Sequence, residues 1–144
     1  MKQFLLDFVN WTWCFPQTLV GFIVKCVKKG KKRKVDIGGK TYTVYDCKLK
    51  SGSVSLGKYI LLGEGHTYSL DTIKHEYGHY RDSLRFGWLY LFVIGIPSFC
   101  WCQYYKKNNK KIQIAYYDFW TERRADKLGG VNRKKNFEIF LQNT

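Results

Sequence analysis

The segment "IKHEYGHYRD", residues 73–82, places His75 and His79 four positions apart, with Glu76 directly after the first histidine. Side chains four residues apart are neighbours on one face of an α-helix, so the two imidazoles can direct ring nitrogens at one point. This geometry suits a tetrahedral Zn²⁺ ion, and the adjacent carboxylate can take a proton from a metal-bound water. The spacing predicts His75 and His79 as zinc ligands and Glu76 as a general base. The alternative is a surface helix whose histidines bind nothing.

A catalytic zinc ion needs a third protein ligand and an open fourth position. In "FWTERRADKLGG", Glu122 and Asp126 are also one helical turn apart, so both can face the histidine helix. We expect Glu122 to coordinate the metal and Asp126 to accept the outer N–H of a ligand histidine, which fixes its tautomer. Two alternatives stay open. The carboxylates can pair with neighbouring basic residues on an exposed face, or His66 in "GEGHTYS" can be the third ligand.

Two helices must position these residues. "SLDTIKHEYGHYRDSLRFG" predicts the first, with Ser69 or Asp71 as its N-cap and Gly87 at its end. Residues 112–128 predict the second, which Gly129-Gly130 should stop.

The residues before the histidine helix predict a small sheet. "VDIGGKTYTVYDCKLKSGSVSLGKYILLGEG" alternates in polarity and carries hairpin signals at Gly38-Gly39 and at Ser51-Gly52. "KYILL" is typical of a final, more buried strand. Strands followed by helices predict an α+β domain over residues 35–144, with an apolar insertion at residues 86–105.

Residues 1–34 read as a membrane-association segment. The apolar residues recur at helical spacing, and residues 25–34 carry seven lysines and arginines, which is a basic amphipathic pattern. The stripe consists of Leu19, Phe22, Ile23, Cys26 and Val27. The formal charge of +14 indicates a polyanionic partner. We expect an anionic membrane surface rather than nucleic acid, because no nucleic-acid motif accompanies the basic run. A helix packed on the body of the protein is the alternative.

The second apolar stretch, Phe86 to Cys102, resembles a membrane span by hydropathy. A single crossing would separate the histidines from Glu122, which must meet them at one ion. We therefore expect the stretch to turn back at Gly95 and Pro97 or to lie against the domain and the interface, with the catalytic domain on the cytoplasmic side. The five cysteines predict reduced thiols, and "CWC", residues 100–102, is expected to face the core or the membrane rather than the metal.

"HEYGH" followed by "TERRAD" resembles the gluzincin arrangement of zinc metallopeptidases, HExxH plus ExxxD on a second helix. The resemblance implies His75, His79 and Glu122 as zinc ligands, Glu76 as general base and Asp126 as the orienting residue. It also implies a minimal zincin-like fold with a small twisted sheet, whose edge, supplied by "KYILL", would receive the substrate strand. A large C-terminal subdomain does not fit this length. The candidates for stabilising the oxyanion are Tyr68, Tyr116, Tyr117 and His66.

The wider stretch "VSLGKYILLGEG…TIKHEYGHYRDSLRFGWLYLFVIGIPS…YYDFWTERRADKLGGV", which is most of the chain, also resembles a group of small bacterial proteins regarded as membrane-associated peptidases. We therefore expect a zinc-dependent metallopeptidase that binds one Zn²⁺ ion and cleaves peptide or protein substrates at a membrane surface. The first alternative is a membrane-associated zinc protein whose metal site is structural or inactive. The second alternative is a basic nucleic-acid-binding protein.

Overall fold

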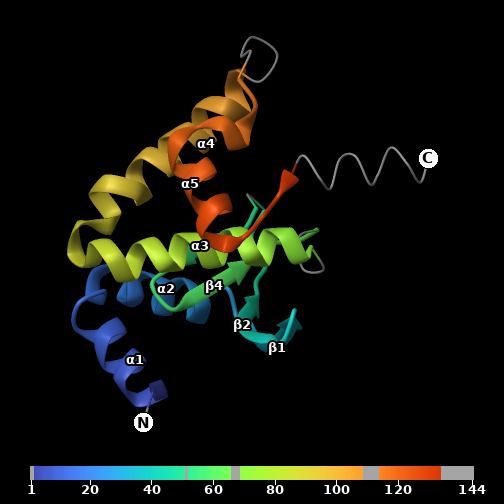
Figure 1. Ribbon diagram of the computed structural model, residues 1–144. Coiled ribbons are helices and arrows are strands. Elements are labelled where there is room, and N and C mark those ends of the chain that lie inside the picture. The colour runs from blue at the N-terminus through green and yellow to red at the C-terminus, as the bar shows by residue number, and fades with distance from the viewer. Residues whose placement is uncertain (1, 51, 66–68, 109–113, 134–144) are drawn as a thin grey trace.

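A computed structural model describes residues 2–50, 52–65, 69–108 and 114–133. Within these ranges the chain forms five α-helices and one four-stranded sheet, which confirms the predicted α+β class (Figure 1). The elements are α1 (Lys2–Trp11), α2 (Phe15–Val27), β1 (Lys31–Ile37), β2 (Lys40–Asp46), β3 (Val54–Leu56), β4 (Tyr59–Leu62), α3 (Leu70–Phe86), the short helices η1 (Gly87–Leu89) and η2 (Leu91–Gly95), α4 (Ile96–Asn108), η3 (Tyr116–Asp118) and α5 (Trp120–Gly129).

The first predicted hairpin is confirmed. Strands β1 and β2 pair antiparallel, with Lys31 opposite Asp46 and Ile37 opposite Lys40. The turn between them uses two consecutive glycines with positive φ, 57° at Gly38 and 78° at Gly39, a conformation that glycine adopts without steric cost. Residue 34 lies inside β1, so the expected boundary between residues 34 and 35 falls within a paired strand.

The second predicted hairpin, at Ser51-Gly52, is wrong. The strand order is β1-β2-β4-β3, so β2 pairs parallel with β4 and β3 pairs antiparallel with β4. All four residues of β4 are buried, and an apolar strand of this kind gains most in the middle of a sheet. "KYILL" is therefore a central strand. The edge beside it is β3, which corrects the expectation that "KYILL" would receive a substrate strand.

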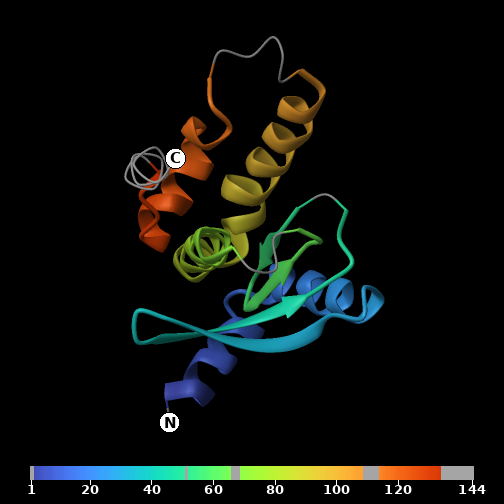
Figure 2. The same cartoon turned by 90° about the vertical axis from the view of Figure 1, so that its right-hand side faces the viewer.

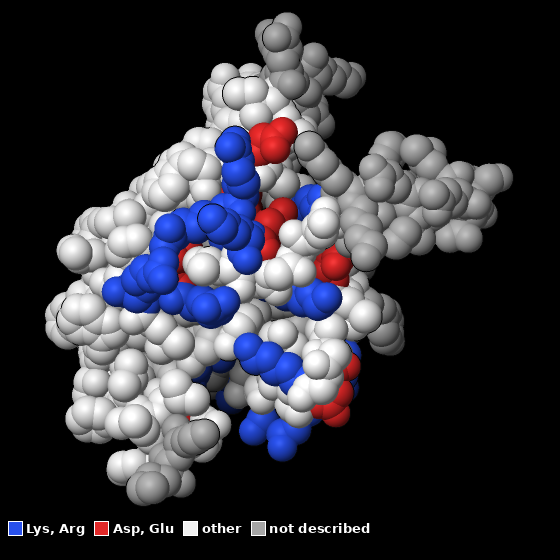
Figure 3. Space-filling view, viewed as in Figure 1, with Lys and Arg blue, Asp and Glu red and all other residues white. Residues whose placement is uncertain are grey.

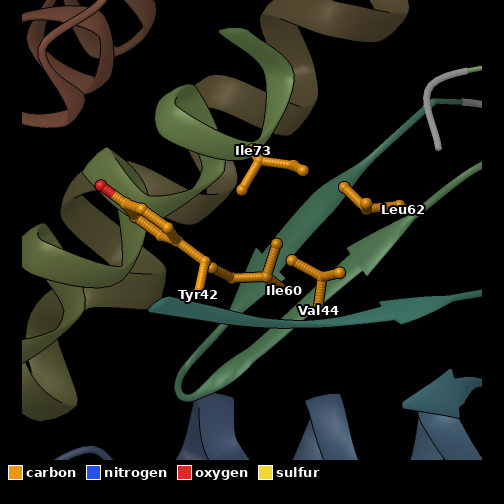
Figure 4. Packing of buried hydrophobic residues seen from close by; sticks show 5 residues of the cluster. All are labelled: Tyr42, Val44, Ile60, Leu62 and Ile73. Carbon is orange, nitrogen blue, oxygen red and sulfur yellow. The ribbon is translucent and has the colours of Figure 1, made fainter. Parts of the chain in front are cut away.

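The sheet is covered on both faces. Against α3 it packs a core cluster of Tyr42, Val44, Ile60, Leu62 and Ile73 (Figure 4). On the opposite face Cys47, Tyr59 and Leu61 are buried, and Val24 of α2 packs against them. Figure 2 shows the sheet between these two helices. The sheet thereby fixes α3, the histidine helix, through its apolar side and leaves the other sides of α3 for α5 and the metal site.

The histidine helix has the predicted boundaries. Ser69, and not Asp71, is its N-cap, because the Ser69 side chain accepts a hydrogen bond from the Thr72 amide at 3.3 Å. Gly87 ends it with φ of 53°. A Cβ atom at this position would overlap the Trp13 ring, so glycine is required here for space as well as for conformation.

The second helix is shorter than predicted. It begins at Trp120 instead of residue 112, and residues 109–113 lie outside the described part of the chain. Ala115 and Phe119 have extended backbones, with ψ of 147° and 142°, which interrupt any helix before Trp120. The stop at Gly129-Gly130 is confirmed, since Gly130 is left-handed with φ of 75°.

The apolar stretch after α3 does not reverse at Gly95 and Pro97. The helix continues through both, from the π-helical turn η2 directly into α4, whose second residue is Pro97. The change of direction occurs earlier, where α3 ends, and α5 later runs back to α3 (Figure 1). None of the helices in the described ranges is long and apolar enough to cross a membrane.

Candidate metal centre

Small residues allow α3 and α5 to cross in close contact. A Cβ atom at Gly78 would overlap the backbone of Ala125, and one at Gly129 would overlap the carbonyl oxygen of Lys74. The two helices thus meet backbone to backbone at two points. Gly78 lies between the two motif histidines in the chain, so the closest approach of α5 falls at the histidine pair. This packing brings Glu122 next to both imidazoles.

The predicted ligands come together. His75, His79 and Glu122 are all buried, and one ligand atom of each lies within 4.8 Å of the others. Glu122 approaches His75 Nε2 with Oε2 at 3.3 Å and His79 Nε2 with Oε1 at 3.8 Å. The two imidazoles are perpendicular, with centroids 4.9 Å apart. The three side chains therefore lie close enough to hold one metal ion. His66 lies outside the described residues.

The outer nitrogen of His75 has the expected partner. Asp126 Oδ1 lies 2.7 Å from His75 Nδ1. A carboxylate in this position favours a proton on Nδ1 and leaves Nε2, the nitrogen that faces Glu122, for a metal. The alternative of two exposed carboxylates is wrong, because Glu122 and Asp126 are both buried. Neighbouring Arg124 binds Asp82 instead.

Two polar residues that the sequence did not predict complete the centre. Ser98 of α4 donates a hydrogen bond from Oγ to Glu122 Oε1 at 2.5 Å. Arg133 donates to both oxygens of Asp126, at 2.6 and 2.9 Å. Ser98 had one available signal, since it is the only side chain between Phe86 and Trp101 that is neither aliphatic, aromatic nor a cysteine. No sequence pattern pointed to Arg133. It lies after the glycines that end α5, and only the folded chain brings it to Asp126.

The charges of the cluster are arranged to attract a cation. Burial alone would lower the pKa of His75, but hydrogen bonds with Asp126 and Glu122 outweigh it and raise the pKa to about 9. Burial would raise the pKa of Glu122, yet hydrogen bonds from His75 and His79 hold it well below its usual value. Asp126 behaves likewise, because His75 and Arg133 lower its pKa against the effect of burial. Both carboxylates therefore stay charged; Asp126 is paired with Arg133 and His75, and the cationic partner of Glu122 is protonated His75.

The cluster forms the floor of a pocket of about 790 Å³. Glu76, which is also buried, lines the same pocket as the three candidate ligands. Residues of edge strand β3, of η2 and of α4 also line it. The candidate base, the candidate ligands and a sheet edge thus border the same pocket.

Two tyrosines from η3 also line this pocket. The Tyr117 ring lies edge-on to His75, with centroids 5.4 Å apart, and burial raises the pKa of both Tyr116 and Tyr117. Both phenols therefore keep their protons at neutral pH and remain hydrogen-bond donors. Tyr68, like His66, lies outside the described residues. Cys102 reaches the pocket wall, Cys100 is exposed, and all five cysteines are free thiols.

Comparison of the chain with protein-family models, with curated proteins and with solved structures finds no match. The resemblance to gluzincins therefore rests on the "HEYGH" and "TERRAD" motifs, and it stays a prediction. The arguments for function that follow depend on the geometry of the site and on general chemistry.

Proposed function

We propose that the protein is a zinc-dependent metallopeptidase of the gluzincin type that acts at a membrane surface. One observation carries the proposal: within the described residues, three side chains form the candidate metal group, His75, His79 and Glu122, and a pocket opens above them. Structural zinc sites are closed by four protein ligands, whereas catalytic sites use three and keep one position open. The site fits the catalytic pattern.

The donor set suits zinc. Two imidazole nitrogens and one carboxylate oxygen form a recurrent catalytic zinc site, and soft thiolates are absent from the described group. Bound there, zinc supplies a Lewis acid that lowers the pKa of a coordinated water toward neutrality. Asp126 holds the Nδ1 proton of His75, and Ser98 holds one oxygen of Glu122, so two of the ligands are oriented before a metal arrives.

Glu76 is the residue that moves protons in this proposal. Its carboxylate takes a proton from the attacking water and delivers it to the amine that leaves. Tyr117, protonated and beside His75, is our candidate donor to the oxyanion that forms on the carbonyl.

Strand β3 supplies the substrate strand with a place to pair. Among the described residues this edge strand has one side without a strand partner; its Ser55 carbonyl accepts a hydrogen bond from the Tyr90 hydroxyl at 3.4 Å, and Val54, Ser55 and Leu56 line the pocket. An extended peptide can add to such an edge through main-chain hydrogen bonds, while its side chains alternate between the two faces. A peptide in this position passes over the metal floor.

The decisive experiment combines metal analysis with a peptide-library assay of three proteins: wild type, Glu76→Gln and Glu64→Gln. Glu64 is an exposed loop residue, so its variant is a matched control. We expect one zinc per chain in all three and cleavage by wild type and Glu64→Gln alone, because the amide at position 76 cannot act as a base. Cleavage by Glu76→Gln would disprove the mechanism. Bound zinc without cleavage by wild type would favour the structural-site alternative.

A further inference from the structure

The N-terminal helices pack with their polar side inward. The side chains that α1, α2 and their connection bury against the protein are small or polar: Asn10, Cys14, Gln17, Thr18 and Gly21. Asn10 donates to the Tyr80 hydroxyl at 3.0 Å. Gln17 donates to Ser83 Oγ at 3.0 Å and to the Gly87 carbonyl at 2.9 Å. A helix of a water-soluble protein normally buries its apolar stripe and exposes its polar one. Here the fully buried positions are the small and polar ones, although Val24 of α2 packs partly buried against the sheet.

The predicted apolar stripe of α2 points outward. Ile23 is 50% exposed and Val27 is 69% exposed, and on α1 Phe4 is 78% exposed. Helices that associate through small and hydrogen-bonding residues while apolar side chains face outward are characteristic of a lipid environment. The alternative, a helix packed on the body of the protein, holds for α2 in part: Val24 packs against the sheet and the Phe22 ring lies 6.3 Å from that of Tyr59, while Ile23 and Val27 stay exposed.

A second exposed apolar segment adjoins the first. Among the described residues, 23 large hydrophobic side chains are exposed, of which twelve belong to residues 4–27 and six to residues 88–104. The two segments touch, because Trp88 donates to the Thr12 carbonyl at 3.0 Å and Trp13 donates to the Leu84 carbonyl at 3.1 Å. We call their joint surface the apolar face. In Figure 3 the lower left of the molecule, over α1, is almost free of charged residues, and a band of basic side chains lies beside the corner after α3.

The metal pocket opens onto the apolar face. Val20, Phe92, Ile96 and Phe99 line the pocket and are also exposed, Phe92 to 70% and Phe99 to 64%. A substrate strand paired with β3 would therefore have the metal floor on one side and the apolar face beside it. An entrance of this composition is suited to apolar groups of a ligand.

The charges around the apolar face fit an anionic bilayer. Basic side chains follow directly after α2, and they are exposed: Lys28, Lys29, Lys31, Lys32 and Lys34. Each lysine near an anionic surface adds to binding, and Trp11, Trp13 and Trp88 are of the type that favours the interface. A second copy of this chain would bring the same basic segments together, so charge favours lipid as the occupant.

We propose that the apolar face docks on an anionic bilayer and that the pocket takes an extended segment of a membrane-anchored polypeptide lying in the interface. The proposal has two parts. The part on the substrate, which we call the substrate half, rests on the proposed peptidase function, whereas the part on binding to the bilayer, the docking half, does not. The protein would bind its substrate from the lipid side, with β3 pairing to the backbone and with Phe92, Ile96 and Phe99 against its apolar side chains.

Photo-crosslinking tests the docking half without any catalysis. Benzoylphenylalanine is placed at Phe22, at Phe92 or, as a control, at Leu70, which is 51% exposed at the far end of α3. The full chain is irradiated with vesicles of phosphatidylcholine and phosphatidylglycerol. We expect lipid adducts at positions 22 and 92 at least tenfold above position 70. Crosslinks to a second copy of the chain at these positions, or equal lipid adducts at all three, would overturn the proposal.

Cleavage of matched peptide pools tests the substrate half. One library is offered free in solution and again acylated on the same vesicles. We expect the anchored pool to be cleaved at least tenfold faster by wild type. Phe8→Ser/Ile23→Ser, which alters the apolar face outside the pocket, should lose this preference and keep the wild-type rate on free peptides. Equal rates on both pools would overturn the substrate half. Cleavage of neither pool would reject the peptidase function, and the crosslinks would still decide the docking.

Discussion

The zinc affinity of this site should rise more steeply with pH between 7 and 9 than the affinity of a site whose histidines have ordinary pKa values. The metal-free protein holds a proton on His75, whose pKa is about 9 because Asp126 and Glu122 outweigh the effect of burial. Zinc binds the neutral imidazole, so this proton must leave. With a pKa of about 9, the neutral fraction of His75 rises from about 1% at pH 7 to about one half at pH 9, and the apparent affinity should rise about fiftyfold.

Asp126→Asn provides the internal test. Removing the charge at position 126 lowers the pKa of His75, so less of the affinity is lost to the proton at pH 7. The same change weakens the support of a ligand histidine, which typically costs about ten- to a hundredfold in affinity. At pH 9 the proton costs wild type only about twofold, so the second effect dominates. The variant should therefore bind zinc more weakly than wild type at pH 9, and this deficit should shrink at pH 7.

The assay is competition for zinc with a chromophoric chelator, with the chelator's own proton affinity corrected at each pH. Wild type and Asp126→Asn are titrated between pH 6.5 and pH 9.5. A wild-type change of less than about fivefold between pH 7 and 9 would refute a proton on His75 as the competitor. Parallel curves for the two proteins would refute Asp126 as the group that holds this proton.

Two further predictions concern the same site. Glu122→Ala should lose zinc at limiting metal concentration, measured by metal analysis after gel filtration, because it removes one of the three protein donors; full occupancy would promote His66 to a ligand. Tyr117→Phe should lower kcat about tenfold or more with zinc content and KM little changed, since it removes a donor to the transition state and not to the ground state; an unchanged kcat would leave Tyr116 as the candidate.

The features that the sequence predicted correctly are those that depend on a single residue or on its immediate neighbours in the chain. The cap at Ser69, the stop at Gly87 and the turn at Gly38-Gly39 each follow from a side chain or a φ angle in place. The two histidines were predictable for the same reason, because helical spacing alone puts them on one face. Glu122 required one more assumption, that its helix would cross the histidine helix.

Features that depend on contacts between residues far apart in the sequence were not predicted. The helix predicted from residue 112 begins at Trp120, because Trp101 stacks on Phe119 with centroids 4.6 Å apart and donates to the Tyr116 carbonyl at 2.9 Å. These contacts hold the backbone before Trp120 out of the helix. The parallel pairing of β4 with β2 likewise depends on burial of both its faces, which no hairpin signal records. Arg133 belongs to the same group.

Gly78 is the residue at which the packing of α5 on α3 most directly determines the geometry of the metal site. It lies between the two histidines of the motif, and a Cβ atom there would overlap the Ala125 backbone. In isolation, Gly→Ala within a helix stabilises by about 0.5–1 kcal/mol. Here the methyl group must push α5 away from α3, and overpacking of this kind costs about 1–3 kcal/mol. Glu122 moves with α5, away from the histidines that remain on α3.

Gly78→Ala should therefore lower the denaturant midpoint and weaken zinc binding together. The control is Gly95→Ala, where the nearest atom to an added Cβ is a Leu91 side-chain carbon at 3.4 Å, an ordinary contact. Chemical unfolding and the chelator competition measure the two effects on the same samples. If Gly78→Ala kept zinc affinity within about twofold of wild type while losing stability, the crossing of the helices would serve packing alone. If both properties were unchanged, the close approach of α5 at Gly78 would itself be wrong, and with it the position of Glu122.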